Sequence, residues 1–148
     1  FRRVLFRSES LFERMTKAPI VILETDLERR VDHIFKEYIE EDLGSLQTLH
    51  DNPEDALNAL SERLQGSLQA ISRRLGGVNH KQLRNMMQEA FYHHAQGDAS
   101  LHREWIQSLL QDYYDPMYDY QLERKKDRIV ARGQPEQVSE YLTSEYGN

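Results

Sequence analysis

Apolar positions recur every three or four residues along most of this 148-residue chain, which predicts a series of amphipathic helices. Asp26 has the side chain of a helix N-cap, and the apolar stripe after it predicts a helix that ends near Gly44. A second helix is predicted from Asn52 and Pro53 to the glycine pair Gly76-Gly77, and a third from about Asn79 to Gln96.

A fourth helical stripe begins near Ser100 and reaches Pro116. Proline lacks an amide proton and clashes with the preceding turn, so we expect a kink or break there, with helix resuming through Lys126. Four tyrosines surround this proline, and we expect at least some of them to pack the junction, with hydroxyl groups held by neighbouring aspartates. These tyrosines are Tyr113, Tyr114, Tyr118 and Tyr120.

Two short apolar runs interrupt the helical pattern. Residues 19–24 are typical of a strand buried on both faces of a parallel sheet. Ile129 to Ala131 predict a second strand, with a turn at Gly133 and a last helix from Pro135. The resulting fold class is α/β but predominantly helical, with a helical insertion between two short strands of a parallel sheet.

Two strands do not make a stable sheet alone, so the remaining strands are expected in a missing N-terminal portion of the protein. The isolated chain should then be poorly stable or prone to association. Residues 1–8 contain a segment that matches a translated sequencing adapter, and we interpret them as non-native, with residues 9–148 as the protein. The alternative is a basic N-terminal arm. Residues 10–17 predict a short helix or turn.

Composition narrows the classes of function. A net charge of −6 argues against nucleic-acid binding by the whole surface. The absence of cysteine excludes disulfides, thiolate metal sites and a cysteine nucleophile. No apolar run approaches the roughly 20 residues that a membrane helix needs, so we expect a cytoplasmic protein with no membrane partner.

Two groups of polar residues contain side chains that can bind metal ions. His93 and His94 are adjacent, so they point about 100° apart on a helix and leave no evident third ligand. The aspartates around Pro116 are interrupted by that proline, and Asp115 fits a turn residue ahead of it. We therefore predict no metal site, and no catalytic residue is identified.

The candidates for ligand binding are basic. Arg29 and Arg30 follow the first strand, where open α/β sheets bind ligands, and are predicted to hold phosphate or diphosphate. The alternative is that they are solvated helix residues paired with nearby acids. A run of cations follows the tyrosines and suits contacts to RNA phosphates, with aromatic rings stacking on unpaired bases. The predicted RNA-binding residues are Arg124, Lys125, Lys126 and Arg128.

A second basic group surrounds the glycine pair. Its members are Arg63, Arg73, Arg74, His80, Lys81 and Arg84. For either basic group, an ordinary solvated face is the alternative.

Three segments carry a resemblance to a known family: residues 18–24 followed by Arg29-Arg30-Val31, the turn 73–77, and the block 113–132. Together they make the chain, from Glu9 to about Leu142, similar to the C-terminal part of bacterial tRNA 2-selenouridine synthases. The resemblance implies an enzyme that converts wobble 2-thiouridine of tRNA to 2-selenouridine through an S-geranyl intermediate.

The resemblance also implies partners and substrates. Selenophosphate and geranyl diphosphate would be substrates of the full-length enzyme, with no bound cofactor. Family members carry an N-terminal rhodanese-like domain with a reactive cysteine, followed by a P-loop domain. This chain resembles the C-terminal portion of that P-loop domain with a helical subdomain. Its partners would be tRNA and the missing N-terminal part of its own chain, and the fragment alone would be inactive.

Two other interpretations stay open at this point. The chain could be a non-catalytic helical module that binds RNA or protein, or the C-terminal part of a P-loop kinase. The upstream coding sequence separates them. A rhodanese-like domain with a phosphate loop indicates the selenium enzyme, a phosphate loop alone indicates the kinase, and a start codon near Leu11 indicates the module.

Overall fold

The computed structural model describes residues 17–147, so the predictions for residues 1–8 and for nearly all of residues 10–17 lie outside the described residues. The described chain divides into two compact units. The helical unit comprises residues 26–118. The sheet unit comprises residues 17–25 and 119–147.

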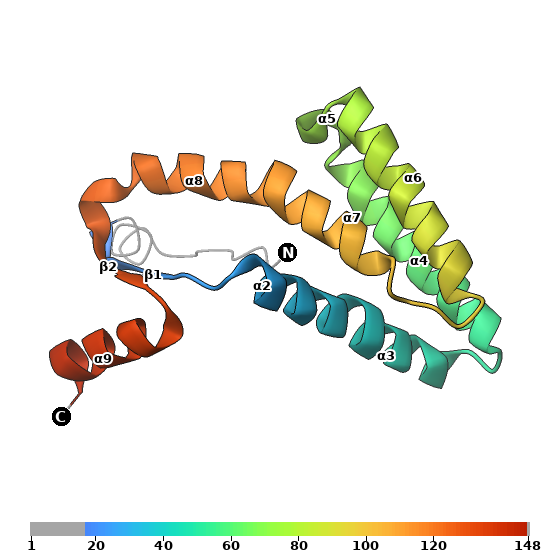
Figure 1. Cartoon of the computed structure of the whole chain (residues 1–148), viewed down its shortest axis with the longest axis horizontal. Helices are drawn as coiled ribbons and strands as arrows, with labels where there is room; N and C mark the ends of the chain where they lie inside the picture. Colours follow the sequence, from blue (N-terminus) through green and yellow to red (C-terminus); the bar gives the residue numbers. More distant parts are fainter. Residues whose placement is uncertain (1–16, 148) are drawn as a thin grey trace, which may run out of the picture. The chain divides into compact units, whose positions relative to one another are not determined.

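The helical unit is built from helices joined by short connections. Figure 1 shows α4 and α6 side by side, joined through the short α5, and α4 also packs against α3. Helix α7 contacts α2 and α6. The elements are α2 (Leu27–Ile34), a π-helical segment (Phe35–Glu41), α3 (Asp42–Leu49), α4 (Pro53–Ala70), α5 (Ser72–Leu75), α6 (Gly77–His94), α7 (His102–Leu109) and a second π-helical segment (Leu110–Tyr114).

The predicted helix starts at Asp26 and Asn52 are confirmed. Asp26 Oδ1 accepts a hydrogen bond from the Arg29 amide at 2.8 Å, and Asn52 Oδ1 accepts one from the Glu54 amide at 2.9 Å. Gly76 ends α5 with a φ of 82°, a conformation that favours glycine. These local signals therefore place the helix boundaries where capping chemistry requires them.

The predicted helix end at Gly44 is wrong. Helical backbone continues from α2 through the first π-helical segment and α3 to Leu49. Leu43 and Leu46, on either side of the glycine, pack against the apolar core. Packing of an apolar face therefore outweighs the low helix propensity of one glycine, which amounts to about 1 kcal/mol.

Of the predicted kink or break at Pro116, the break is wrong, because helix α8 (Asp115–Arg124) contains this proline. Asp115 has helical backbone angles, with φ −63° and ψ −48°. The preceding Leu110–Tyr114 segment is π-helical, which shifts the hydrogen-bond register by one residue. That shift lets the chain accept a residue without an amide proton and remain helical.

Two smaller boundaries also differ from the prediction. The second predicted helix is interrupted at Ile71, which separates α4 from α5. The third helix begins at Gly77, two residues before the predicted start, and ends at His94.

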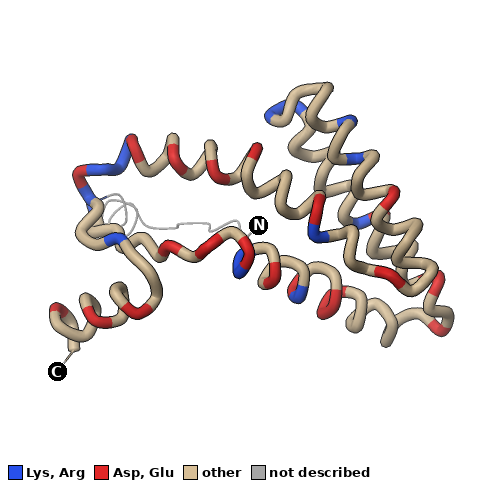
Figure 2. The backbone as a smooth tube through the Cα atoms, viewed as in Figure 1, with Lys and Arg blue, Asp and Glu red and all other residues tan. Residues whose placement is uncertain are grey.

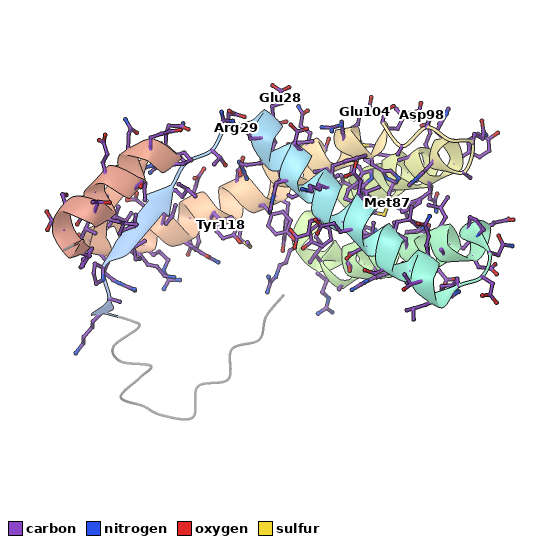
Figure 3. All side chains as sticks on the ribbon, turned by 90° about the horizontal axis from the view of Figure 1, so that it is seen from below. Glu28, Arg29, Met87, Asp98, Glu104 and Tyr118 are labelled. Carbon is purple, nitrogen blue, oxygen red and sulfur yellow. The ribbon has the colours of Figure 1, made fainter. Side chains whose placement is uncertain are left out.

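The main apolar core lies wholly within the helical unit. Met87 of α6, labelled in Figure 3, is 2% exposed and belongs to it. The other members are Val31, Phe35, Ile39, Leu60, Leu64, Leu68, Leu75, Leu83, Ala90, Phe91, Trp105, Ile106, Leu110 and Tyr113.

The sheet unit contains two parallel strands, β1 (Ile20–Leu23) and β2 (Ile129–Gly133). The chain enters this unit along α8 and a 3₁₀ turn (Lys126–Arg128), and α9 (Pro135–Tyr146) packs against both strands. The predicted parallel pairing across a helical insertion is confirmed. The prediction that β1 is buried on both faces is wrong for this chain, because Leu23 is 58% exposed and the described residues supply one neighbouring strand.

Gly133 has a different role from the predicted turn. It is the last residue of β2 and is buried. A Cβ atom there would lie 2.5 Å from Gln137 Oε1, whose side chain accepts the Gln134 amide proton at the start of α9. A larger residue at this position would therefore have to displace the Gln137 side chain, because α9 approaches the strand closely.

Candidate functional site

Arg29 lies in the first turn of α2 with its side chain exposed (Figure 3). Its Nε atom is 3.5 Å from Asp26 Oδ2, and Asp26 also caps the helix. An exposed pair of this kind contributes little to stability. The guanidinium therefore stays accessible to an anion.

Arg30 has a stronger partner. Its Nη1 and Nη2 atoms donate to the two carboxylate oxygens of Asp115 at 3.2 and 2.5 Å, in a half-buried fork. The hydrogen bond to Asp115 raises the pKa of Arg30, and burial opposes that rise. A phosphate at Arg30 must compete with this carboxylate. Neighbouring helix residues point about 100° apart, so the structure does not bring Arg29 and Arg30 together on one ligand.

The predicted RNA-binding cations at the end of α8 are mostly engaged within the sheet unit, where they form a basic run in Figure 2. The Arg124 guanidinium lies 5.9 Å from the centre of the Tyr120 ring. Lys126 Nζ is 3.2 Å from Glu123, and Arg128 Nε donates to the Ala18 carbonyl at 3.0 Å. Only Lys125 of the predicted four makes no hydrogen bond, ion pair or ring contact through its side chain within residues 17–147.

The tyrosine block divides into packed and exposed members. Tyr113 is buried and Tyr114 half-buried, with ring centres 4.9 Å apart, which confirms that part of the block packs the helix. Burial and the neighbouring tyrosines raise the pKa of Tyr114 to about 12. Tyr118 and Tyr120 are exposed. The predicted hydroxyl–aspartate bonds are not formed among the described residues, and Asp115 binds Arg30 instead.

A buried histidine, His102, and its contact with the half-buried His94 were missed by sequence reasoning. Trp105 Nε1 donates to His102 Nδ1 at 2.9 Å, and His102 Nε2 lies 3.0 Å from His94 Nδ1. Indole is only a donor, so neutral His102 carries its proton on Nε2 and donates it to His94. Burial lowers the pKa of His102 to about 4, with His94 adding to the effect. This pair is therefore neutral and joins α6 to α7.

The i, i+3 spacing of His102 and Trp105 was the available signal for this contact. His93, by contrast, lies at the surface 4.0 Å from Glu89. Within residues 17–147, no three histidine, aspartate or glutamate side chains gather closely enough to bind a metal ion. The same part of the chain contains no helix with the length and apolar character needed to cross a membrane.

The second basic group occupies one end of the α4–α5–α6 hairpin. Most of its cations are exposed, and a groove of about 290 Å³ lies between α4 and α6 beside them. The groove is lined by Gln65, Gly66, Leu68, Gln69, His80 and Arg84.

Comparison with known proteins shows which family this chain is similar to. Residues 5–148 match the model of a family described as the tRNA 2-selenouridine synthase AAA domain. No solved structure matches the chain.

Several curated relatives carry the name tRNA 2-selenouridine synthase. The one from Alcanivorax borkumensis is 44% identical over 138 residues, covering 91% of this chain and 37% of the relative. The one from Hahella chejuensis is 40% identical over 134 residues, covering 90% of this chain and 35% of the relative. The chain thus spans little more than a third of the length of these relatives.

Proposed function

The chain belongs to the tRNA 2-selenouridine synthase family, and from this premise we propose that it is part of an enzyme that replaces sulfur with selenium at the wobble 2-thiouridine of tRNA. The reaction passes through an S-geranyl intermediate, with geranyl diphosphate and selenophosphate as substrates. The observation that carries the proposal is the family match, which covers residues 5–148.

The two described strands would belong to a larger P-loop-type parallel sheet. Parallel sheets are normally covered on both faces, yet β1 and β2 leave Leu23 and Val130 exposed. A shallow groove of about 500 Å³ beside α9 is lined mainly by apolar side chains, including Leu23, Val138 and Leu142. We propose that the part of the relatives' length that this chain does not span supplies the missing strands and the phosphate loop.

Arg29 and Arg30 remain the proposed contacts for diphosphate or selenophosphate. Their position directly after β1 supports this role, because ligands of open α/β sheets bind at the carboxyl ends of the strands. Arg29 is the stronger candidate, since its pair with Asp26 is exposed, whereas Arg30 is held by Asp115. Arg124, Lys125, Lys126 and Arg128 remain proposed tRNA contacts, with Lys125 the most available.

The test uses the full-length enzyme that contains this chain. Purified enzyme is incubated with tRNA bearing 2-thiouridine, geranyl diphosphate and selenophosphate, and the nucleosides are analysed by mass spectrometry. We expect 2-selenouridine when both small substrates are present and S-geranyl-2-thiouridine when selenophosphate is omitted. A full-length enzyme that forms neither nucleoside would overturn the proposed function.

Arg29→Ala tests the anion contact in the same assay. We expect the KM for geranyl diphosphate or selenophosphate to rise about tenfold, the effect of losing roughly 1.4 kcal/mol of binding. Lys36→Ala is the matched control, because Lys36 is an exposed cation two turns further along the same helical stretch. If the Arg29 variant has the same KM as the Lys36 variant for each of the two small substrates, Arg29 is an ordinary solvated residue and does not contact the anion.

A further inference from the structure

Charge is distributed very unevenly along this chain. No aspartate or glutamate occurs between Glu62 and Glu89, whereas residues 63–88 contain five arginines and lysines. Since the whole chain carries −6 and this segment carries +5, the remaining residues carry −11. A cationic segment within an acidic protein creates a local positive potential that attracts polyanions.

The fold concentrates these cations at one end of a helical hairpin. Residues 63–88 form the second half of α4, all of α5 and the first two-thirds of α6, and Figure 2 shows the basic positions at α5 and along the adjoining part of α6. We call the surface formed by Arg73, Arg74, Lys81 and Arg84, with the adjacent α4–α6 groove, the hairpin end.

The cations of the hairpin end lack acidic partners. Arg73, Arg74, Lys81 and Arg84 are exposed, and none makes an ion pair or hydrogen bond through its side chain within residues 17–147. Arg63, nearer the middle of α4, lies 3.8 Å from Asp42. The run at the end of α8 differs, because Lys126 is paired with Glu123 and Arg128 donates to a backbone carbonyl. The hairpin end is therefore the more available of the two basic surfaces.

The groove beside these cations has polar walls. Gln65 and Gln69 of α4 face His80 and Arg84 of α6 across it. The Gln65 amide nitrogen donates to Ser61 Oγ at 2.8 Å, which leaves its carbonyl oxygen as an acceptor and one amide proton as a donor. Amide, imidazole and guanidinium groups together can hydrogen-bond the edge of a nucleobase and a phosphate.

Gly66 lies in the wall of this groove, in the middle of α4. A Cβ atom at this position would meet nothing within 4 Å, so packing inside the protein does not require glycine there. Glycine in a helix interior is less stable than alanine, so its presence here has a cost that packing does not explain. A missing side chain at an open groove lets a ligand approach the helix backbone closely.

From these observations we propose that the hairpin end binds the phosphate backbone of the tRNA substrate and that the α4–α6 groove holds one unpaired base. The proposal rests on the proposed function for its choice of RNA. It adds a second RNA contact, in the helical unit, to the one proposed at the end of α8. Arginine and lysine would contact successive phosphates, and the groove would restrict binding to a strand with an accessible base.

Salt dependence of tRNA binding by the full-length enzyme tests the backbone contact. The fourfold variant Arg73→Gln, Arg74→Gln, Lys81→Gln, Arg84→Gln should lower the slope of log affinity against log salt by about 3, at roughly 0.7–0.9 per lost phosphate contact. Affinity at low salt should fall at least tenfold. An unchanged slope and affinity would overturn the proposal.

Single lysine variants supply a matched comparison. Lys81→Gln should lower the salt slope by about 1, whereas Lys36→Gln, which removes another exposed lysine outside the hairpin end, should leave it unchanged. Equal slopes in the two variants would show that only overall charge matters and would overturn the local contact. Circular dichroism confirms that each variant retains its helices.

Gly66→Ala tests the groove separately. The added methyl group should weaken tRNA binding several-fold without changing the salt slope and without loss of thermal stability, because no protein atom opposes it. An unchanged affinity for tRNA would show that the α4–α6 groove does not hold a base.

The nucleoside assay on the wild-type enzyme tests the proposed function independently. If the wild-type enzyme is active and the hairpin-end variants bind tRNA as tightly as it does, only the proposed RNA contact at the hairpin end is contradicted. If the wild-type enzyme neither modifies nor binds tRNA, both this contact and the proposed function are contradicted.

Discussion

The helical unit and the sheet unit differ in how completely each buries its own apolar side chains. Every member of the main apolar cluster belongs to the helical unit. Among the described residues of the sheet unit, Val138 is the sole buried large hydrophobic side chain, and Leu23, Val130 and Leu142 are exposed. Amphipathic helices that are close in sequence can cover one another, whereas parallel strands need further strands and helices that the described residues do not supply.

Both units carry exposed ion pairs, but among the described residues the half-buried ion pair lies in the helical unit. The Arg30–Asp115 fork and the His94–His102–Trp105 chain are half-buried or buried within the helical unit. The sheet unit relies on exposed pairs, such as Arg132 with Glu24. Buried polar contacts define one arrangement of packed elements, while exposed pairs contribute little. The comparison therefore predicts that equivalent substitutions have larger effects in the helical unit.

The largest expected effect comes from truncating the core. Leu60 is fully buried, and Leu60→Ala should lower the free energy of unfolding by about 2–5 kcal/mol. Leu142, in the sheet unit, is 42% exposed, and Leu142→Ala should cost less than about 1 kcal/mol. Urea denaturation followed by circular dichroism measures both. Equal losses of unfolding free energy in the two variants would contradict the predicted difference between the two units.

The next effect is a pH dependence confined to the helical unit. Burial lowers the pKa of His102 from 6.5 to about 4, so the unfolded chain binds this proton more readily than the folded one. Stability is fully present above pH 6.5 and falls as the pH is lowered towards 4, by about 3 kcal/mol in total. Chemical denaturation at a series of pH values measures this loss.

Two histidine variants identify the source of the pH dependence. His102→Gln retains an acceptor for the Trp105 indole and should remove most of the slope between pH 6.5 and 4. His33→Gln, at an exposed histidine of the same unit, is the matched control. If the stability of the His102 variant still falls as the pH is lowered from 6.5 to 4, the pH dependence comes from other groups.

A smaller effect is expected from the ion pairs. Asp115→Asn removes the charged fork on Arg30 and should cost about 1 kcal/mol, after allowance for its partial exposure. Glu24→Gln removes the exposed partner of Arg132 in the sheet unit and should change stability by no measurable amount. Thermal unfolding of both variants at low and high salt makes the comparison. A larger loss from Glu24→Gln would contradict it.

The smallest effects concern two glycines and should have opposite signs. Gly66→Ala should raise the free energy of unfolding by up to about 1 kcal/mol, because alanine favours the helix and meets no neighbour. Gly133→Ala should lower it by about 0.5–1 kcal/mol, because the new Cβ displaces Gln137 from the cap of α9. Denaturant midpoints of the two variants test the signs, and stabilisation by both would show that α9 does not depend on this close approach.

Much of the fold could be predicted because its signals are local. The apolar stripes after Asp26 and Asn52 identify helices, and the side chains of those two residues cap them as expected. The errors at Gly44 and Pro116 share a cause. Both residues disfavour helix locally, but Leu43 and Leu46 pack onto the core, and a π-helical segment precedes the proline. Tertiary contacts and register shifts are invisible to a local rule.

The candidate sites were less predictable. The basic residues around the glycine pair could be named from the sequence. The fold was needed to show that Arg63 lies near Asp42, whereas Arg73, Arg74, Lys81 and Arg84 have no acidic partner within residues 17–147. Asp115 fitted a turn residue, whereas the structure places it against Arg30, 85 positions away. His102 gave no sign of burial in its polar neighbourhood, yet it is fully enclosed against Phe91 and Trp105.

The order of residues was sufficient to establish the helical periodicity, most helix starts, the parallel strand pair and the family resemblance, since each depends on short segments or on a direct match. The three-dimensional fold was needed to show which cations are already paired, which histidine is buried and which strand side chains are exposed among the described residues. Those properties depend on distances between residues far apart in the chain, and burial and charge compensation follow from such distances.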